Sequence, residues 1–514
     1  MRTYLLGIDV GTTGSKALLI DPQGTAKASV TTEYPLRTPR PLWAEQDPEA
    51  WWRATVTSIK RVLRQSHARA GQVAGIGLTG QMHGLVLLDR HGAVIRPCIL
   101  WNDQRSAAQC AAITNAIGSR RVIGLTGNPV LPGFTAPKLV WVREHEPSAY
   151  RRVAKVLLPK DYIRYRLTGE FFSEVSDASG TSLFAVGNRR WSDDMLQALR
   201  VPRAWLPDVT ESPVASAAVS TNAARQTGLL DDTPVVGGGG DQAAQAVGTG
   251  VITEGTVFVT LGTSGVVFAA SDKYRVEPQG RLHAFCHAVP GQWHLMGVML
   301  SAGGSLRWYR DALCVAEMAE AKHAGRNVYD VMLRSASRVA AGCEGLIFLP
   351  YLAGERTPHP DPNARGVFFG LTLRHGKTDM TRSVIEGVTY GLRDSLELMR
   401  RLGLPLKQAR ASGGGTRSRL WRQILADVFD MPIGTVNVTE GAAYGAALLA
   451  AVGVGVHRSV ADACRNSIRL TGTVKPGPAA KVYADYYTRY RELYPALASQ
   501  FASLAPVVNK HLEM

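Results

Sequence analysis

The sequence of 514 residues contains no long apolar run and no pair of cysteines spaced as C-x-x-C. No stretch reaches the roughly 18 apolar residues that a membrane-spanning helix needs, so we do not expect a membrane protein. The N-terminus leads almost directly into an apolar segment without a cleavage site of small residues, and we expect no secretory signal peptide. The six cysteines are scattered along the chain, which is typical of reduced thiols in the cytoplasm rather than of a disulfide framework.

Blocks of basic residues are also absent, although the formal net charge is +16. The basic residues occur as dispersed pairs such as Arg120-Arg121 and Arg400-Arg401, and no stretch interleaves them with aromatic residues. A nucleic-acid-binding protein needs such a patch, so we expect neither a nucleic-acid partner nor a membrane partner. A basic surface would nevertheless attract a polyphosphate substrate.

The common phosphate-binding signatures are missing as well. The segment "HGKT", residues 375–378, resembles the end of a Walker A loop, but Leu371 stands where that loop needs its first glycine. No dinucleotide-binding fingerprint follows the first apolar segment. Three histidines and one cysteine lie between residues 283 and 294, but their segment is typical of a strand pair, and we do not expect a zinc site there.

Strand-like and helix-like segments alternate through the chain, which favours an α/β architecture. The length exceeds what one hydrophobic core usually supports, so we expect at least two large domains. The segments "LGIDVGTTGSKALLI" and "VFVTLGTSGVVFAAS" share the order strand, glycine-threonine turn, strand, about 250 residues apart. We therefore predict two related domains, residues 1–240 and 241–514, with the last helices packing back on the first domain.

The first candidate site is the turn Gly11–Gly14 in "LLGIDVGTTGSK", which carries Asp9 before it and Lys16 after it. Glycines let the backbone approach a phosphate closely, and the threonine hydroxyls add hydrogen-bond donors. A carboxylate at the end of a strand beside such a turn is well placed to hold Mg²⁺ through water. The alternative is a tight hairpin with an ordinary aspartate.

The second candidate is the run Gly237–Gly240 followed by Asp241 and Gln242. Four glycines between a strand and a helix allow close approach of backbone or ligand, and open α/β sheets bind ligands at the carboxyl ends of their strands. A carboxylate there can accept a proton from a substrate hydroxyl. The alternative is that Asp241 only caps the helix. A third, weaker candidate is "SGGGTRSRLW", residues 412–421, where a glycine-rich turn leads into a helix and presents unpaired N–H groups.

These motifs in this order, D-x-G-T-T, G-G-G-D, L-G-T-S-G and a late G-G-G turn, resemble those of the FGGY family of carbohydrate kinases. Two longer stretches strengthen the resemblance. "GFTAPKLVW", residues 133–141, is similar to the first signature of the family, and "GVFFGLTLRHGKTDMTRSVIEG", residues 366–387, is similar to the second. The resemblance covers nearly the whole chain.

The resemblance implies a two-domain α/β fold of the actin-like, ribonuclease-H-like type with the active site in a cleft between the domains. It implies an enzyme that uses ATP and Mg²⁺, and the scattered cysteines predict a cytoplasmic location. Many members are dimers, and the sequence leaves the oligomeric state of this chain open. The segments "GQMHG", "PLWAEQDPEAWW", "ILWNDQR", "LLPKDY" and "YLAGERTPH" resemble those of members that phosphorylate D-xylulose to D-xylulose 5-phosphate in D-xylose catabolism.

The resemblance also assigns roles to single residues. It implies that Asp241 is the general base that takes the proton of the sugar hydroxyl and that Asp9 is the carboxylate associated with Mg²⁺. The implied sugar contacts are Met82, His83, Asp241 and Gln242. The implied nucleotide and phosphate contacts are Thr12, Thr13, Gly14, Lys16, Thr263, Gly303, Gly414 and Ser418. Some members carry Asn in place of Gln242, and both amides can bind a sugar hydroxyl.

Other functions remain open on the sequence alone. A kinase of another ketose or polyol, such as ribulose, L-xylulose or erythritol, would share the fold and the phosphate turns. An actin-like ATPase without a sugar substrate would hydrolyse ATP with no stimulation by sugar, and the sugar-facing segments argue against it.

Overall fold

The computed structural model describes residues 3–512, and the chain divides into two compact units. Unit 1 comprises Met1–Thr253, Ala270–His294 and Asn437–Arg469; unit 2 comprises Glu254–Ala269, Leu295–Val436 and Leu470–Met514. Each unit contains helices and a mixed sheet, which confirms the predicted two-domain α/β fold. The predicted domain boundary near residue 240 stays a prediction. Within the described residues, no helix combines the length and the apolar character needed to cross a membrane.

The main sheet of unit 1 is built around a hairpin. Its strands are β1 (Tyr4–Val10), β2 (Gly14–Ile20), β3 (Ala26–Glu33), β5 (Val73–Gly80), β13 (Ala215–Ala218), β14 (Pro234–Val236) and β15 (Gly239–Gly240). The order is β13-β14-β5-β1-β2-β3, and β15 also pairs with β5. β1 and β2 are antiparallel, whereas β1, β14 and β15 all run parallel to β5. The carboxyl ends of β1, β5 and β15 therefore lie side by side.

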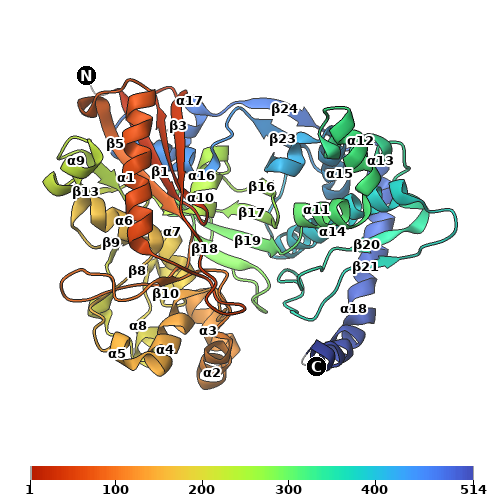
Figure 1. Ribbon diagram of the computed structural model, residues 1–514, viewed down its shortest axis with the longest axis horizontal. Helices are drawn as coiled ribbons and strands as arrows, with labels where there is room; N and C mark the ends of the chain where they lie inside the picture. The colour runs from red at the N-terminus through yellow and green to blue at the C-terminus, as the bar shows by residue number, and fades with distance from the viewer. Residues whose placement is uncertain (1–2, 513–514) are drawn as a thin grey trace. The chain divides into compact units, whose positions relative to one another are not determined.

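Helices cover both faces of this sheet, which explains why successive residues of β1 are buried. The helices of unit 1 are α1 (Pro48–Gln65), α2 (Ala107–Ile117), α3 (Ser119–Thr126), α4 (Thr135–His145), α5 (Pro147–Tyr150), α6 (Pro159–Thr168), α7 (Val175–Ala178), α8 (Asp193–Leu199), α9 (Thr221–Thr227), α10 (Asp241–Thr249), α16 (Gly441–Gly453) and α17 (Val460–Ser467). α1 packs across β2 and β3 (Figure 1). α16 packs against β1 and β5 together with α10. Leu6 and Ile8 join the core on the α1 side, whereas Leu5 packs with Ala443 of α16.

Two glycines let α16 approach the sheet closely. A Cβ at Gly7 would lie 2.0 Å from the carbonyl oxygen of Ala443, and a Cβ at Gly77 would lie 1.9 Å from that of Ala446. Neither position can therefore carry a side chain without moving the helix. The close packing fixes α16, and α16 in turn supports α10, the helix that begins at Asp241.

A second core in unit 1 lies around α4, α8 and several short strands. The short strands of unit 1 are β4 (Glu45–Gln46), β6 (Val86–Leu88), β7 (Cys98–Ile99), β8 (Lys155–Leu157), β9 (Phe172–Glu174), β10 (Phe184–Ala185), β11 (Arg190–Trp191), β12 (Asp208–Thr210) and β18 (His283–Cys286), and all but β4 and β9 contribute residues to this core. β6 pairs with β8 and β4 with β7, so the segment after β5 is held between two small sheets.

Unit 2 repeats the hairpin arrangement of unit 1. Its main strands are β16 (Thr256–Leu261), β17 (Gly265–Ser271), β19 (Trp293–Met299), β22 (Gln408–Ser412), β23 (Ile433–Val436) and β24 (Leu470–Val474), in the order β19-β17-β16-β22-β23-β24. β16 and β17 form an antiparallel hairpin and β16 runs parallel to β22, as β1 does with β2 and β5. Both predicted glycine-threonine hairpins are therefore confirmed.

The helices of unit 2 surround this sheet. They are α11 (Gly303–Leu313), α12 (Val315–His323), α13 (Val328–Ala336), α14 (Lys377–Arg401), α15 (Arg419–Phe429) and α18 (Ala479–Leu512), and a further hairpin joins β20 (Ile347–Leu349) to β21 (Val367–Phe369). α18 packs on α14 and α15 through buried tyrosines such as Tyr483 and Tyr490. The chain after residue 455 is thus helical in two places, with α17 in unit 1 and α18 in unit 2. The prediction that the last helices pack back on the first domain stays a prediction.

Candidate active site

Five of the predicted site residues meet at the carboxyl edge of the unit 1 sheet. Asp9 lies near the end of β1 opposite Thr79 of β5, and the β15 residue Gly239 pairs with the same Thr79. The chain leaves β5 into Met82 and His83, and it leaves β15 into Asp241 and Gln242. Because these three strand ends are neighbours, the catalytic candidate, the metal candidate and the sugar candidates share one edge.

Asp241 is the first residue of α10, and Gly240 rather than Asp241 is the N-cap of that helix. The N–H of Gly240 donates a 3.0 Å hydrogen bond to the Ser176 hydroxyl, which itself donates to the buried Glu174 carboxylate. This fixes the junction between strand and helix. Desolvation, and then the nearby charge of Asp9, raise the pKa of Asp241 to about 7, while hydrogen bonds from Gln242 oppose the shift. A carboxylate with this pKa suits a general base near neutral pH.

Asp9 fits the role of a carboxylate beside a cation. Its Oδ1 is buried and, within residues 3–512, has no hydrogen-bond partner. Desolvation raises its pKa to about 6, whereas the charge of Lys16, its cross-strand neighbour, lowers it. Two carboxylates at one strand edge repel each other, and the repulsion contributes to the raised pKa of Asp241. A bound Mg²⁺ would relieve this repulsion and use the unpartnered oxygen.

The predicted sugar contacts Met82 and His83 lie against the glycines of two neighbouring turns. A Cβ at Gly240 would lie 3.0 Å from Met82 Sδ, and a Cβ at Gly180 would lie 2.3 Å from the His83 ring. The His83 ring stacks on Phe134 with 4.5 Å between centroids, and its Nδ1 lies 2.8 Å from the carbonyl oxygen of Gly180. Since a carbonyl only accepts, Nδ1 carries the proton. Met82 therefore lies against the residue that precedes Asp241, and the His83 ring is held in one orientation.

The turn Gly11–Gly14 is held by side chains from three other segments. Gln46 Nε2 donates to the carbonyl of Thr12 at 2.7 Å, and Gln81 Nε2 donates to Gln46 Oε1 at 3.0 Å. Trp101 Nε1 donates to the Thr12 hydroxyl at 3.1 Å, and that hydroxyl donates to Gln81 Oε1 at 3.3 Å. The turn is thus preorganised by an amide pair and an indole, and Thr13 is exposed at its tip.

The Lys16 side chain is engaged within unit 1. Its Nζ lies 2.7 Å from Glu440 Oε2, just before α16. To contact a phosphate as predicted, the Lys16 ammonium would either bind the phosphate and Glu440 together or exchange Glu440 for the phosphate.

The four remaining nucleotide candidates line one pocket in unit 2. Thr263, Gly303, Gly414 and Ser418 are all at its wall, and its volume is about 690 Å³. The pocket lies where the β16–β17 turn meets the N-terminus of α11, the turn before α15 and the start of α13. The N–H of Gly303 donates to the Gly262 carbonyl at 2.8 Å, which joins two of these turns directly. The volume suits a drug-sized ligand.

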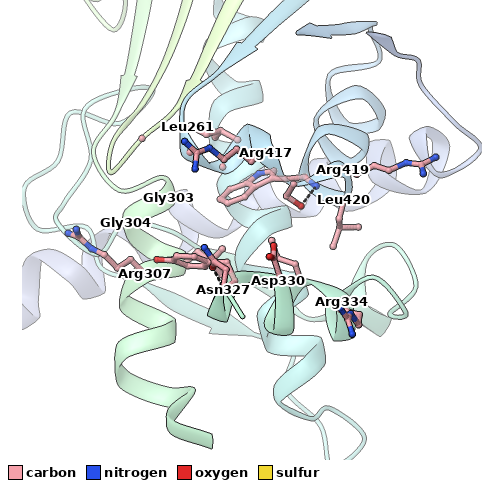
Figure 2. A pocket seen from close by; sticks show the side chains of 18 of the residues that line it. Leu261, Gly303, Gly304, Arg307, Asn327, Asp330, Arg334, Arg417, Arg419 and Leu420 are labelled. Atoms are coloured by element: carbon pink, nitrogen blue, oxygen red, sulfur yellow. Dashed lines mark hydrogen bonds between the residues drawn. The ribbon is translucent and has the colours of Figure 1, made fainter. Parts of the chain in front are cut away.

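Positive charge and helix N-termini surround this pocket. Ser418 caps α15, with its hydroxyl accepting a hydrogen bond from the N–H of Trp421, and Asn327 caps α13 in the same way. Four exposed arginines also line it: Arg307, Arg334, Arg417 and Arg419. Figure 2 shows Arg307 and Arg334 on opposite sides of Asp330, the acidic residue of the pocket. Helix N-termini and guanidinium groups favour an anionic ligand, as the polyphosphate of a nucleotide is.

Comparison with known proteins gives the family of the chain. The models of the N-terminal and C-terminal domains of the FGGY family of carbohydrate kinases match residues 4–248 and 257–454. The chain belongs to the FGGY family of carbohydrate kinases. An FGGY kinase transfers a phosphoryl group to an alcohol group of a sugar, so this chain is an enzyme of the phosphotransferase class. The resemblance seen in the sequence motifs is confirmed over nearly the full length.

Individual FGGY kinases are similar to the chain from end to end. It is 42% identical over 496 residues to a xylulose kinase of Escherichia coli, covering 96% of this chain and 99% of that protein. It is 32% identical over 508 residues to a gluconokinase of Bacillus subtilis, covering 98% of each. Among solved structures, a xylulose kinase from Rhodospirillum rubrum matches with a TM-score of 0.90 and 32% identity, covering 97% of this chain and all of that one.

Several residues of this FGGY kinase site were not singled out from the sequence. Trp101, Gln46 and Gln81 bind the glycine turn, and Arg307 and Arg417 line the unit 2 pocket. The first three lie in the segments that resemble sugar-facing segments of the family. That resemblance is the only feature of the sequence that could have pointed to them. The segments at residues 41–52 and 99–105 also do structural work, since Arg105 pairs with Asp103 and Glu45 and stacks over Trp43.

The segment between residues 283 and 294 is part of the packing of unit 1. His287 Nε2 lies 3.0 Å from the carbonyl oxygen of Val251, and His283 Nδ1 lies 3.3 Å from Asn128 Oδ1. Among the described residues, no cluster of histidine, cysteine, aspartate or glutamate has the arrangement of a metal site.

Proposed function

We propose that the protein is an ATP-dependent xylulose kinase that phosphorylates the 5-hydroxyl of D-xylulose to give D-xylulose 5-phosphate. The relatives named xylulose kinases, at 35 to 42% identity over nearly their whole length, support this substrate. The observation that carries the chemistry is the shared strand edge of Asp241, Asp9, Met82 and His83. Consumption of ATP and release of a sugar phosphate fit a cytoplasmic enzyme.

In the proposed mechanism Asp241 accepts the proton of the sugar hydroxyl as that oxygen attacks the γ-phosphorus. One P–O bond forms, the bond from the γ-phosphorus to the bridging oxygen of ADP breaks, and the proton stays on the Asp241 carboxyl until product leaves. Phosphoryl transfer asks the protein for in-line positioning and charge neutralisation rather than for covalent chemistry. The fixed junction at Gly240 and Ser176 supplies the positioning of the base.

In the proposed complex the sugar is bound by side chains whose polar atoms are available for hydrogen bonds. Within the described residues, Oε1 of Gln242 is buried and has no hydrogen-bond partner, so a sugar hydroxyl can donate to it. Met82 supplies an apolar wall. Asp9 would hold Mg²⁺, which supplies charge neutralisation for the phosphates when bound. Thr12, Thr13, Gly14 and Lys16 would contact the terminal phosphates, and the unit 2 pocket would hold ATP through Thr263, Gly303, Gly414 and Ser418.

The experiment that tests this proposal is release of ADP by the purified protein with MgATP and one sugar at a time. D-Xylulose is compared with D-ribulose, L-xylulose, erythritol, glycerol, D-gluconate and a blank without sugar. Strong stimulation by D-xylulose alone is the expected result. Stimulation by D-gluconate instead would move the substrate to that of the gluconokinase relative, and equal rates with and without sugar would replace the kinase proposal by an ATPase.

A further inference from the structure

A buried lysine contacts the backbone of the predicted sugar-binding residue His83. Lys138 lies in α4 and its side chain is inaccessible to solvent. Its Nζ donates to the carbonyl oxygen of His83 at 3.0 Å and, more weakly, to that of Ile99 at 3.4 Å. Among the described ion pairs none involves Lys138. A buried ammonium without a paired carboxylate is costly, so its place beside a carbonyl needs a reason.

A second side chain of the same helix binds the same oxygen. The hydroxyl of Thr135, also buried, donates to the His83 carbonyl at 3.0 Å. A carbonyl oxygen has two acceptor sites, and here one buried ammonium and one buried hydroxyl occupy them. His83 itself has a φ of 70°, in the left-handed region, and is the central residue of a turn closed by the hydrogen bond from the N–H of Gly84 to the carbonyl of Met82 at 2.9 Å. The two donors of α4 therefore anchor the carbonyl at the centre of a strained turn.

The rest of the same stretch also packs on the sugar candidates. Phe134 stacks on the His83 ring, and a Cβ at Gly133 would lie 2.5 Å from the carbonyl oxygen of Trp101. The stretch from 133 to 138 thus contacts both His83 and Trp101, the residue whose indole binds the Gly11–Gly14 turn. Desolvation lowers the pKa of Lys138 to about 7; Cys98 and Asp103 oppose the shift and Arg105 adds to it.

We propose that Lys138 and Thr135 are positioning residues for sugar recognition, which hold the His83 carbonyl and thereby aim the His83 ring at the sugar. The inference rests on the proposed sugar-binding role of His83. Neither side chain need touch the sugar: each acts through one main-chain oxygen. If Lys138 only filled space in the core, its replacement would lower stability and leave the sugar affinity and the His83 ring unchanged.

The test compares Thr135→Val, Thr135→Ser and Lys138→Met in the full-length protein. Valine removes the donor and keeps the shape, serine keeps the donor, and methionine removes the ammonium while retaining most of the chain length. We expect Thr135→Val and Lys138→Met to raise the KM for D-xylulose by about fivefold or more, with the KM for ATP unchanged, since each removes one buried hydrogen bond to the His83 carbonyl. Thr135→Ser should stay close to the parent protein.

The state of the His83 ring is read independently of any sugar. Nitrogen-15 NMR of histidine-labelled protein, with His83 assigned from a His83→Gln variant, reports whether Nδ1 or Nε2 carries the proton. We expect the His83 signals to move in Thr135→Val and Lys138→Met and to stay in place in Thr135→Ser. In a His83→Ala background, Lys138→Met should add nothing to the loss of sugar affinity.

The outcomes separate this inference from the proposed function. If the parent protein releases no extra ADP with D-xylulose, the substrate proposal fails and the His83 spectrum alone decides the inference. Unmoved His83 signals in both Thr135→Val and Lys138→Met would overturn it. If Lys138→Met fails to fold, the valine and serine pair at residue 135 still gives the decision.

Discussion

Lys16 and Glu440 form an ion pair of 2.7 Å between residues 424 positions apart in the chain. The pair joins β2, directly after the glycine turn, to the start of α16. Both side chains are partly exposed, at 31% and 26%, so the pair adds little to stability. Because the pair lies beside the proposed phosphate turn, we expect its loss to change phosphate binding more than stability.

Replacing Lys16 by methionine should raise the KM for ATP by about tenfold, because a charge-assisted contact to phosphate is lost. Replacing Glu440 by glutamine should lower that KM by about two- to threefold, because the ammonium is no longer shared with a carboxylate. Steady-state kinetics at saturating sugar measures both, with melting temperature as the control. An unchanged KM in Lys16→Met would remove Lys16 from the phosphate site.

Replacing Asp241 by asparagine should lower kcat by about 10²- to 10⁴-fold, the usual contribution of a general base. Binding of ATP should survive, since the proposed nucleotide pocket contains none of the residues around Asp241. Calorimetric titration with a non-hydrolysable ATP analogue checks the second expectation. A fall in turnover of less than about tenfold would contradict the assignment of the base.

The pH dependence of kcat/KM should show one acidic limb near pH 7. Asp241 must be ionised to accept a proton, and its pKa is raised to about 7, so activity is lost as the pH falls through this value. In Asp9→Asn the nearby negative charge is gone, the pKa of Asp241 falls, and the limb should move to lower pH. The same variant should need more Mg²⁺ for half-maximal rate. A limb that stays in place, with an unchanged Mg²⁺ titration, would exclude Asp9 from both roles.

Two glycines of the proposed nucleotide pocket should respond differently to alanine. A Cβ at Gly303 would lie 2.5 Å from the Gly262 carbonyl oxygen, so Gly303→Ala should lower both the melting temperature and ATP affinity. A Cβ at Gly414 meets no atom within 4 Å, so Gly414→Ala should leave the fold intact. If ATP binds against Gly414, this variant should still weaken binding by about tenfold through steric conflict. Full ATP affinity in Gly414→Ala would place the nucleotide elsewhere in the pocket.

The sequence predicts those features whose causes are local. The two glycine-threonine hairpins and the strand, glycine run and helix at Asp241 follow from residues adjacent in the chain. The pairing of Lys16 with Glu440 and the bond from Trp101 to Thr12 join segments 424 and 89 residues apart. Neither has a local sequence signal, because only the sheet order and the helix packing bring the partners together. For the same reason, the sequence does not predict that α13 lines the unit 2 pocket.

The glycines under α16 have a consequence for synthesis of the chain. Because α16 lies directly on Gly7 and Gly77, the sheet begun by the first strands stays uncovered on one face until residues 441–453 have left the ribosome. Until that point Leu5 and Leu18 lack the helix that buries them, which is encoded more than 400 codons later. A fragment that stops near residue 253 would carry the proposed general base and the proposed sugar contacts yet lack this cover. We therefore expect that the two halves of the sequence do not fold as separate modules, because unit 1 is completed only by residues 437–469.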